Sequence, residues 1–211
     1  MKQVKMLGLA AVAALGLMAM TGAGTASATE LCSTNTSPCT GVMYPPGTAV
    51  SVQLKPGTVA TWTNPIANVT CQKSTIGGKT TSTGAKGVAV TGAIESLAFS
   101  ECKTASGVAC TMRTANLPYA ASFTATGGGN GTLTVTGGGT GDPGVAVECG
   151  FVINCTVTTA DASLEVTGGN PAIAKANALP FTPAGVTCPK EEHLDAEYEV
   201  TAPKPLFIVN P

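Results

Sequence analysis

Short segments in which apolar and polar residues alternate recur along most of the chain. The alternation is clearest over residues 132–136, where Leu133 and Val135 stand between threonines, and it returns in the same form over residues 163–167. Successive side chains of a β-strand point to opposite faces, so each segment predicts a strand with one buried face. About ten such segments, separated by glycine-rich turns, predict an all-β fold, an antiparallel sandwich or barrel of about ten short strands.

Two segments depend on their turn and cap residues. Residues 51–54 and 59–63 flank a Lys-Pro-Gly turn and predict a hairpin. Residues 170–179 fit a helix, with Asn170 as its cap and Pro171 in its first turn, but they also fit a strand. We favour a strand for residues 170–179 and keep a helix as the alternative.

The composition supports a sheet protein. Glycine, threonine, alanine and valine dominate, while aromatic residues make up 4% and charged residues 11% of the chain. Valine and threonine are branched at Cβ, which suits a pleated sheet better than a helix.

We expect a signal peptide over residues 1–28, an amino-terminal arm with a short cystine loop over 29–47, and a single β-domain over 48–211.

The first residues have the layout of a secretory signal. Lys2 and Lys5 precede an apolar run over residues 6–20, and Ala26 and Ala28 frame a cleavage site. The run is shorter than the roughly 20 residues that span a bilayer, so we expect cleavage, no membrane span in the mature protein, and an extracellular location.

The charge of the mature chain excludes some partners. Cleavage removes two lysines and no acids, which leaves nine basic and twelve acidic residues and a net charge of −3. Arg113 is the only arginine. Nucleic-acid binding needs clustered basic residues, so we expect no nucleic-acid partner.

All eight cysteines follow the cleavage site, and an even number in an exported chain predicts four disulfides rather than a metal site. Spacing suggests three near pairs and leaves a fourth by elimination. The suggested pairs are Cys32 with Cys39, Cys102 with Cys110, Cys149 with Cys155, and Cys71 with Cys188. No cysteine is then free to act as a nucleophile, and we expect no cofactor.

The glycine-rich stretch at residues 137–144 contains the G-x-G-x-x-G spacing of dinucleotide-binding loops. Such a loop leads into a helix whose N–H groups face the phosphates, but an apolar strand pattern follows Gly144. Calcium-binding repeats need an aspartate that the stretch does not place correctly. We therefore interpret the segment as a hairpin turn.

His193, Asp195 and Glu197 would share one face of a strand and could ligate a cation, although exposed strand residues give the same pattern. His193 is the only histidine, and no G-x-S-x-G motif is present, so a hydrolase is the least favoured class.

A glycan-binding module would rely on aromatic side chains. The main ones are Trp62, Tyr44, Tyr119 and Tyr198.

The best candidate contact site is the loop between Cys149 and Cys155. It carries Phe151, Val152 and Ile153, which would form an apolar finger if they point outward. More often such residues fold back over the edge of the core.

The carboxyl-terminal part carries a recognisable succession of motifs. "GGNPAIAKANALPF" is followed by "CPKEEHLDAEYEVTAPKPLFIV", which contains a Cys-Pro step, a tyrosine-centred strand and a proline-punctuated last strand. These residues resemble a group of small secreted proteins from high-GC Gram-positive bacteria over Cys149 to Val209, with a looser match from Cys71. The resemblance implies a disulfide-linked β-fold and supplies no site residues.

Together these features predict a secreted, non-catalytic extracellular or cell-envelope protein that acts through surface contacts with an unknown protein or envelope surface. The alternative is an extracellular module that binds a glycan or a cation, and a secreted hydrolase comes third.

Overall fold

The computed structural model describes residues 29–85, 87–151, 153–185 and 188–211, so the predicted signal peptide lies outside the described residues. These residues form fourteen strands and no helix. The strands are β1 (Glu30–Cys32), β2 (Ala49–Leu54), β3 (Ala60–Thr63), β4 (Val69–Thr80), β5 (Val90–Thr104), β6 (Ala109–Ala115), β7 (Tyr119–Gly127), β8 (Asn130–Gly137), β9 (Gly144–Cys149), β10 (Ile153–Thr158), β11 (Asp161–Thr167), β12 (Ile173–Ala184), β13 (Glu192–Ala202) and β14 (Phe207–Val209).

The predicted all-β antiparallel fold is confirmed, with more strands than the ten or so expected. Strand β1 spans three residues, too few for an alternating pattern to mark it, whereas the last strand, β14, lies where the sequence predicts one. Within the described part of the chain, no helix is long and apolar enough to cross a membrane.

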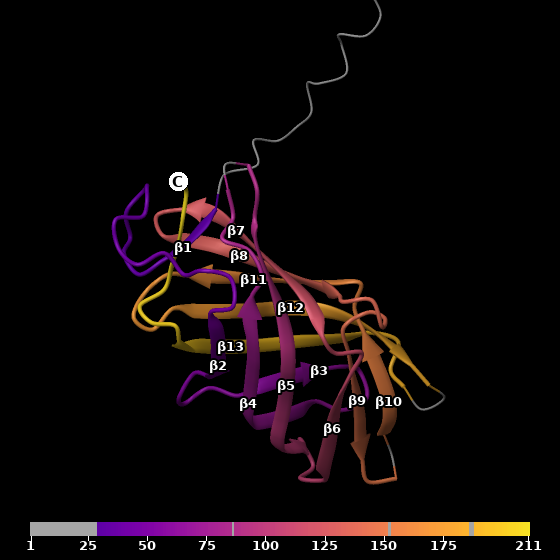
Figure 1. Cartoon of the computed structure of the whole chain (residues 1–211). Helices are drawn as coiled ribbons and strands as arrows, with labels where there is room; N and C mark the ends of the chain where they lie inside the picture. Colours follow the sequence, from indigo (N-terminus) through magenta and orange to yellow (C-terminus); the bar gives the residue numbers. More distant parts are fainter. Residues whose placement is uncertain (1–28, 86, 152, 186–187) are drawn as a thin grey trace, which may run out of the picture.

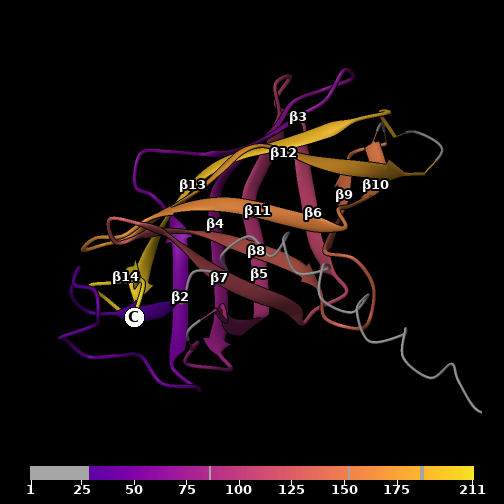
Figure 2. The same ribbon diagram turned by 90° about the horizontal axis from the view of Figure 1, so that it is seen from above.

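Twelve of the described strands form one antiparallel sheet that folds over into two layers. Strands β4, β5, β6, β9 and β10 make one layer, and β7, β8, β11, β12 and β13 cross behind them at a steep angle (Figures 1 and 2). The long strands β5 and β12 join the layers, because β5 also pairs with β7 and β12 also pairs with β10. This is a sandwich with nearly orthogonal layers.

Strands β2 and β3 do not form the predicted hairpin. Both lie between β13 and β4, with Leu54 of β2 opposite Tyr198 and Trp62 of β3 opposite Leu194. They are therefore two halves of one strand position, and residues 55–59 leave the sheet between them. Pro56 has no N–H to donate to a ladder, which explains why the chain bulges there rather than continuing.

Residues 173–184 form strand β12, so the strand interpretation of residues 170–179 is confirmed from Ile173 onward. Ala174 and Ala176 face the interior, and a bulge separates Ala176 from Leu179. In the bulge Ala178 has φ 45°, and its N–H donates to Oδ1 of Asp195 at 2.7 Å. The bulge breaks the alternation, which is why the sequence pattern was ambiguous here.

The core between the layers is built on an aromatic cluster. Trp62 is fully buried, and its ring centre lies 5.7 Å from that of Phe99 and 4.9 Å from that of Phe181. These rings come from β3, β5 and β12, so they hold both layers together. Rings at these separations attract one another beyond the gain from burial alone.

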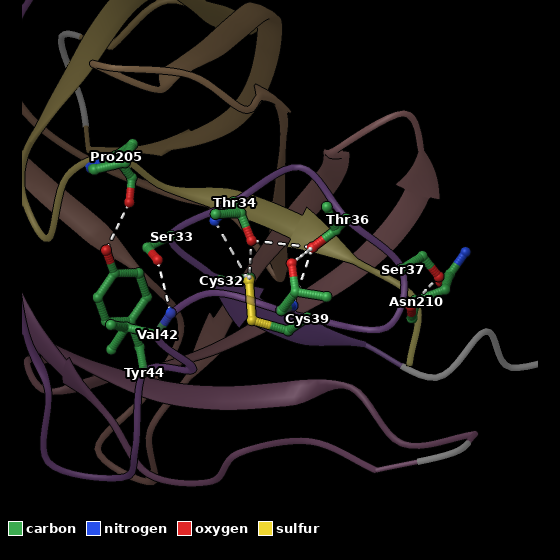
Figure 3. Close-up of a disulfide and its surroundings, with 11 residues drawn as sticks. Cys32, Ser33, Thr34, Thr36, Ser37, Cys39, Val42, Tyr44, Pro205 and Asn210 are labelled. Carbon is green, nitrogen blue, oxygen red and sulfur yellow. Dashed lines mark hydrogen bonds between the residues drawn. A yellow bond between two sulfur atoms is a disulfide. The ribbon is translucent and has the colours of Figure 1, made fainter.

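The amino-terminal arm packs against the carboxyl-terminal end of the chain. Strand β1 pairs with β14, and Leu31 and Ile208 are buried there. Figure 3 shows the adjoining loop, where a disulfide joins Cys32 and Cys39 and the Tyr44 hydroxyl donates to the carbonyl of Pro205 at 2.6 Å. This small sheet closes one end of the sandwich.

All eight cysteines are in disulfides, but only the Cys32–Cys39 pair matches the expected connectivity. The other three pairs differ from those that spacing suggested. They are Cys71–Cys102, Cys110–Cys149 and Cys155–Cys188.

Strand register explains the corrected pairing of Cys102. In register, Cys102 lies opposite Cys71 on one side and opposite Cys110 on the other, so both could be partners. The Cα atoms of Cys71 and Cys102 are 3.9 Å apart, close to a narrow antiparallel pair of about 4.5 Å. In an antiparallel sheet the N–H and C=O of a residue both point to the same neighbouring strand. Those of Cys102 therefore point to β6, so Cys102 and Cys110 form a wide pair, whose side chains are farther apart.

Cys149 and Cys155 are offset in their hairpin rather than opposite each other. Cys149 faces Ile153, and Cys155 faces Val147. Diagonal neighbours of this kind lie roughly 7–8 Å apart, too far for a disulfide. Cys149 instead bonds to Cys110, which is opposite it on β6.

We predict unequal contributions of the disulfides to stability. Cys110–Cys149 spans 39 positions and Cys32–Cys39 spans 7. The chain-entropy model assigns them up to about 4 and about 2 kcal/mol respectively. The Cys110→Ala/Cys149→Ala variant should therefore lose more free energy of unfolding in urea than the Cys32→Ala/Cys39→Ala variant, and equal losses would contradict this account.

A single substitution tests the connectivity itself. In Cys102→Ala, alkylation and mass spectrometry should find Cys71 as the free thiol. A free Cys110 would show that spacing had given the correct pair.

Candidate functional site

Among the described residues, three large apolar side chains are exposed on loops at one end of the sandwich. Ile66 follows β3 and is 55% exposed, Val108 lies in the β5–β6 turn and is 40% exposed, and Phe151 in the β9–β10 turn is 108% exposed. We call Ile66, Val108 and Phe151 the apolar loop end. The β5–β6 and β9–β10 turns lie at the lower edge of the molecule in Figure 1.

The three loops are neighbours. The N–H of Ala105 in the β5–β6 turn donates to the carbonyl of Asn68 at 3.1 Å, which joins the loop of Ile66 to that of Val108. A Cβ placed on Gly150 would stand 3.2 Å from Cγ1 of Val108, so the turn of Phe151 also touches this group. Exposed side chains on three loops therefore share one end of the molecule.

Local bonds fix the loops of Ile66 and Val108. Oδ1 of Asn64 accepts from the N–H groups of Ile66 at 2.9 Å and Ala67 at 2.8 Å, which forms an Asx turn. Thr104 caps the next turn, since its Oγ1 accepts from the N–H of Val108 at 3.0 Å. The side chains of Ile66 and Val108 consequently stand on ordered backbone.

The predicted contact loop divides in two. Phe151 points into solvent, whereas Ile153 is 5% exposed and lies in the core, and Val152 lies outside the described residues. The loop is not closed on itself, because Cys149 and Cys155 bond to separate partners. Sequence reasoning missed Ile66 and Val108, whose only signal is a single apolar residue among Pro, Asn, Ser and Gly.

The carboxylates of the predicted cation row face outward on β13, as expected, but both are engaged by protein groups. Glu197 contacts Lys55 Nζ at 2.8 Å and Lys175 Nζ at 2.5 Å. Asp195 accepts from the backbone of the β12 bulge. Among the described residues, no three His, Cys, Asp or Glu side chains form a group that could hold a metal ion.

His193 lies on β13 opposite Thr63 of β3. Its Nδ1 is buried without a hydrogen bond among the described residues. The neighbouring Glu192 is 3% exposed, and burial raises the pKa of its carboxyl, partly offset by a long hydrogen bond of 3.5 Å from Asn64. A groove of about 200 Å³ beside Asp195 and Glu197 does not include His193 in its lining.

The glycine-rich segment connects two layers and is not a hairpin. It links β8 to β9, which do not pair with each other, and Gly144 begins strand β9 rather than a helix. The hydroxyl of Tyr119 donates to the carbonyl of Gly144 at 3.1 Å, and burial raises the pKa of this tyrosine. The prediction of a turn without a ligand-binding helix is confirmed, and the hairpin interpretation was wrong.

The aromatic side chains considered for glycan binding lie mostly inside. Trp62, Tyr119 and Tyr198 are each exposed by 3% or less. Tyr44 is half-buried against the carboxyl-terminal segment, with its hydroxyl bonded to Pro205.

No protein-family model matches the chain, and no significant match was found among curated proteins or solved structures. The function is therefore argued from the geometry of this molecule.

We predict that Glu197 contributes stability that is lost in acid. A hydrogen bond from Lys175, and to a smaller extent one from Lys55, lowers the pKa of Glu197 from 4.5 to about 2. A lowered pKa in the folded state gives stability that is complete above about pH 4.5 and disappears as the pH falls toward 2. Glu197→Gln should flatten the pH dependence of the urea midpoint across this window.

Lys55→Gln provides the matched control, because it removes one of the two hydrogen bonds to Glu197. The pKa of Glu197 should then be lowered less, so the acid-dependent stability should fall over a narrower pH range but not disappear. An unchanged acid profile in Glu197→Gln would disprove the role of this cluster.

Proposed function

We propose that the protein is a secreted, non-catalytic protein of the cell exterior or envelope that docks through the apolar loop end. Four disulfides are typical of extracellular proteins, and the signal-like start of the chain supports the same location. The resemblance of the carboxyl-terminal part to small secreted proteins of high-GC Gram-positive bacteria is consistent with it.

The observation that carries the proposal is the complete exposure of Phe151 in the turn that follows the disulfide-bonded Cys149. A phenylalanine side chain exposed to water gains free energy when an apolar surface covers it. Cys149, two positions before Phe151, is bonded to Cys110, so the strand end that leads into the turn is held covalently. Val108 beside it and Ile66 on the next loop extend the contact.

The occupant that best fits this surface is a lipid layer with no net charge. The three side chains of the apolar loop end stand on separate loops, and a fluid lipid surface can adapt its shape to contact each of them. Residues 64–68, 105–108 and 150–151 contain no charged side chain, and the mature chain carries net negative charge, which disfavours anionic lipid.

We predict that Phe151→Ser weakens binding to phosphatidylcholine vesicles about thirtyfold. Burying a phenylalanine side chain contributes about 2 kcal/mol, which corresponds to that factor in affinity. Co-sedimentation with sucrose-loaded vesicles measures the change.

Val88→Ser is the matched control for Val108→Ser. Both valines are exposed, but Val88 lies in the hairpin between β4 and β5, at the opposite end of the two strands that lead to the apolar loop end. Val108→Ser should weaken vesicle binding and Val88→Ser should not. Wild-type protein that does not sediment with vesicles would refute the lipid surface as the occupant.

We also predict that the exported protein begins at Thr29. Expression of the full chain in a secreting bacterial host, followed by amino-terminal sequencing of the culture medium, checks this. Retention of the intact chain inside the cell would contradict secretion.

A further inference from the structure

The space between the two layers is not completely filled. Two apolar cavities of about 90 and about 80 Å³ adjoin each other there. Residues from both layers border both cavities, so the two form neighbouring lobes of one interior space. These shared residues are Ile76, Ile94, Val135, Leu164 and Tyr198.

Small side chains create the space. Packed sheets lie about 10 Å apart, and side chains from both faces must fill the gap. Several inward positions around the cavities are alanines, among them Ala121 and Ala174 at the first lobe and Ala162 and Ala176 at the second. Leu133 borders the first lobe and Leu97 the second, and both are only partly buried because the alanines beside them leave space.

Among the polar side chains that border this space, those of Tyr198 and Trp62 differ in their hydrogen bonds. The hydroxyl of Tyr198 lies 3.2 Å from Oγ of Ser74, so it has a partner inside the core. The indole N–H of Trp62 is buried and has no hydrogen-bond partner within the described residues. Trp62 lines the second lobe.

A buried donor without a partner costs free energy, and native structures rarely keep one without a reason. Apolar cavities of comparable size stay dry and bind small apolar molecules, as an engineered cavity of about 150 Å³ does with benzene. A molecule that fills the lobes and offers one acceptor oxygen would restore both the missing contacts and the missing hydrogen bond.

We propose that the interior binds a small, mainly hydrocarbon molecule that carries one carbonyl or hydroxyl oxygen, and that Trp62 Nε1 donates to this oxygen. The hydrocarbon part lies between Val135 and Leu164 of one layer and Ile76 and Ile94 of the other. The size of the lobes sets the ligand at roughly six to eight carbon atoms.

This site is separate from the apolar loop end. Trp62 pairs with Val69, and Val69 pairs with Thr104 just before the β5–β6 turn, so the second lobe lies behind the loops that carry Ile66 and Val108. The interior site does not depend on docking, because Phe151 borders neither lobe.

Trp62 is the only tryptophan and therefore reports on the site directly. We expect 2-heptanone and toluene, two probes of similar size, to raise the midpoint of thermal unfolding of the wild-type protein in a concentration-dependent manner. Only 2-heptanone has an acceptor, so it alone should shift the fluorescence emission of Trp62 to longer wavelength. Absence of stabilisation by both probes would overturn the proposal.

Val135→Phe fills the space shared by both lobes and should weaken binding of both probes at least tenfold. Val135→Leu adds less volume and should weaken binding by a smaller factor, which keeps the test open if the larger side chain prevents folding. Val157→Leu is the matched control, because Val157 is fully buried but lines neither lobe. Equal affinity in all three variants would place the probes elsewhere and refute the site.

Trp62→Phe tests the donor. It keeps an aromatic ring but removes the N–H, so 2-heptanone should lose about fivefold in affinity relative to toluene, as judged by thermal shift. An unchanged preference would refute the hydrogen bond. Phe151→Ser should bind both probes like the wild type, so a failure of vesicle docking leaves the interior site intact.

Discussion

The fold depends on how well the gap between two crossed sheets is filled. A sheet has fixed spacing to its neighbour, so the side chains on both inner faces must supply the volume. This chain has few aromatic residues and uses three of them, Trp62, Phe99 and Phe181, in one cluster at one side of the gap. Elsewhere alanines occupy inward positions around the two lobes, and each unfilled lobe costs about 2 kcal/mol at the usual rate per unit of cavity volume.

Covalent cross-links offset this weakness where the loops are most exposed. Cys71, Cys102, Cys110 and Cys149 stand in one transverse row across β4, β5, β6 and β9. The two disulfides in this row hold the strands from which the turns of Val108 and Phe151 project. The interior can therefore stay loosely filled while the loop end remains ordered.

The sequence predicts the class of fold well because alternation reports directly on strands. Leu133, Val135, Leu164 and Val166 all face the interior as expected, although Leu133 stays partly accessible. What the sequence does not predict is the geometry that depends on contacts between distant segments. The pairing of Cys102 depends on which of two neighbouring strands forms the narrow pair, and that information is not local. The Lys-Pro-Gly turn looks like a hairpin because only β13, some 140 positions later, shows that β2 and β3 share one strand position.

The candidate site was only partly predictable for the same reason. Phe151 stood out between two cysteines, but Ile66 and Val108 gain meaning only when three loops meet. The cavities could not be foreseen at all, because an alanine in a strand looks the same whether a large or a small residue faces it. Likewise, His193, Asp195 and Glu197 resemble a ligand set until Lys55, Lys175 and the bulge at Ala178 are placed beside them.

The transverse row of cysteines has a consequence for biogenesis. During oxidation, Cys102 meets Cys110 across a short turn before it can meet Cys71, since closing a short loop loses less chain entropy than closing a long one. The register of the folded sheet favours the other bond, because Cys71 and Cys102 form the narrow pair there and Cys102 and Cys110 the wide one. The native bridges therefore form most directly when the strands pair before the thiols oxidise, and a chain that oxidises first would need thiol–disulfide exchange along the row to release Cys102 from Cys110.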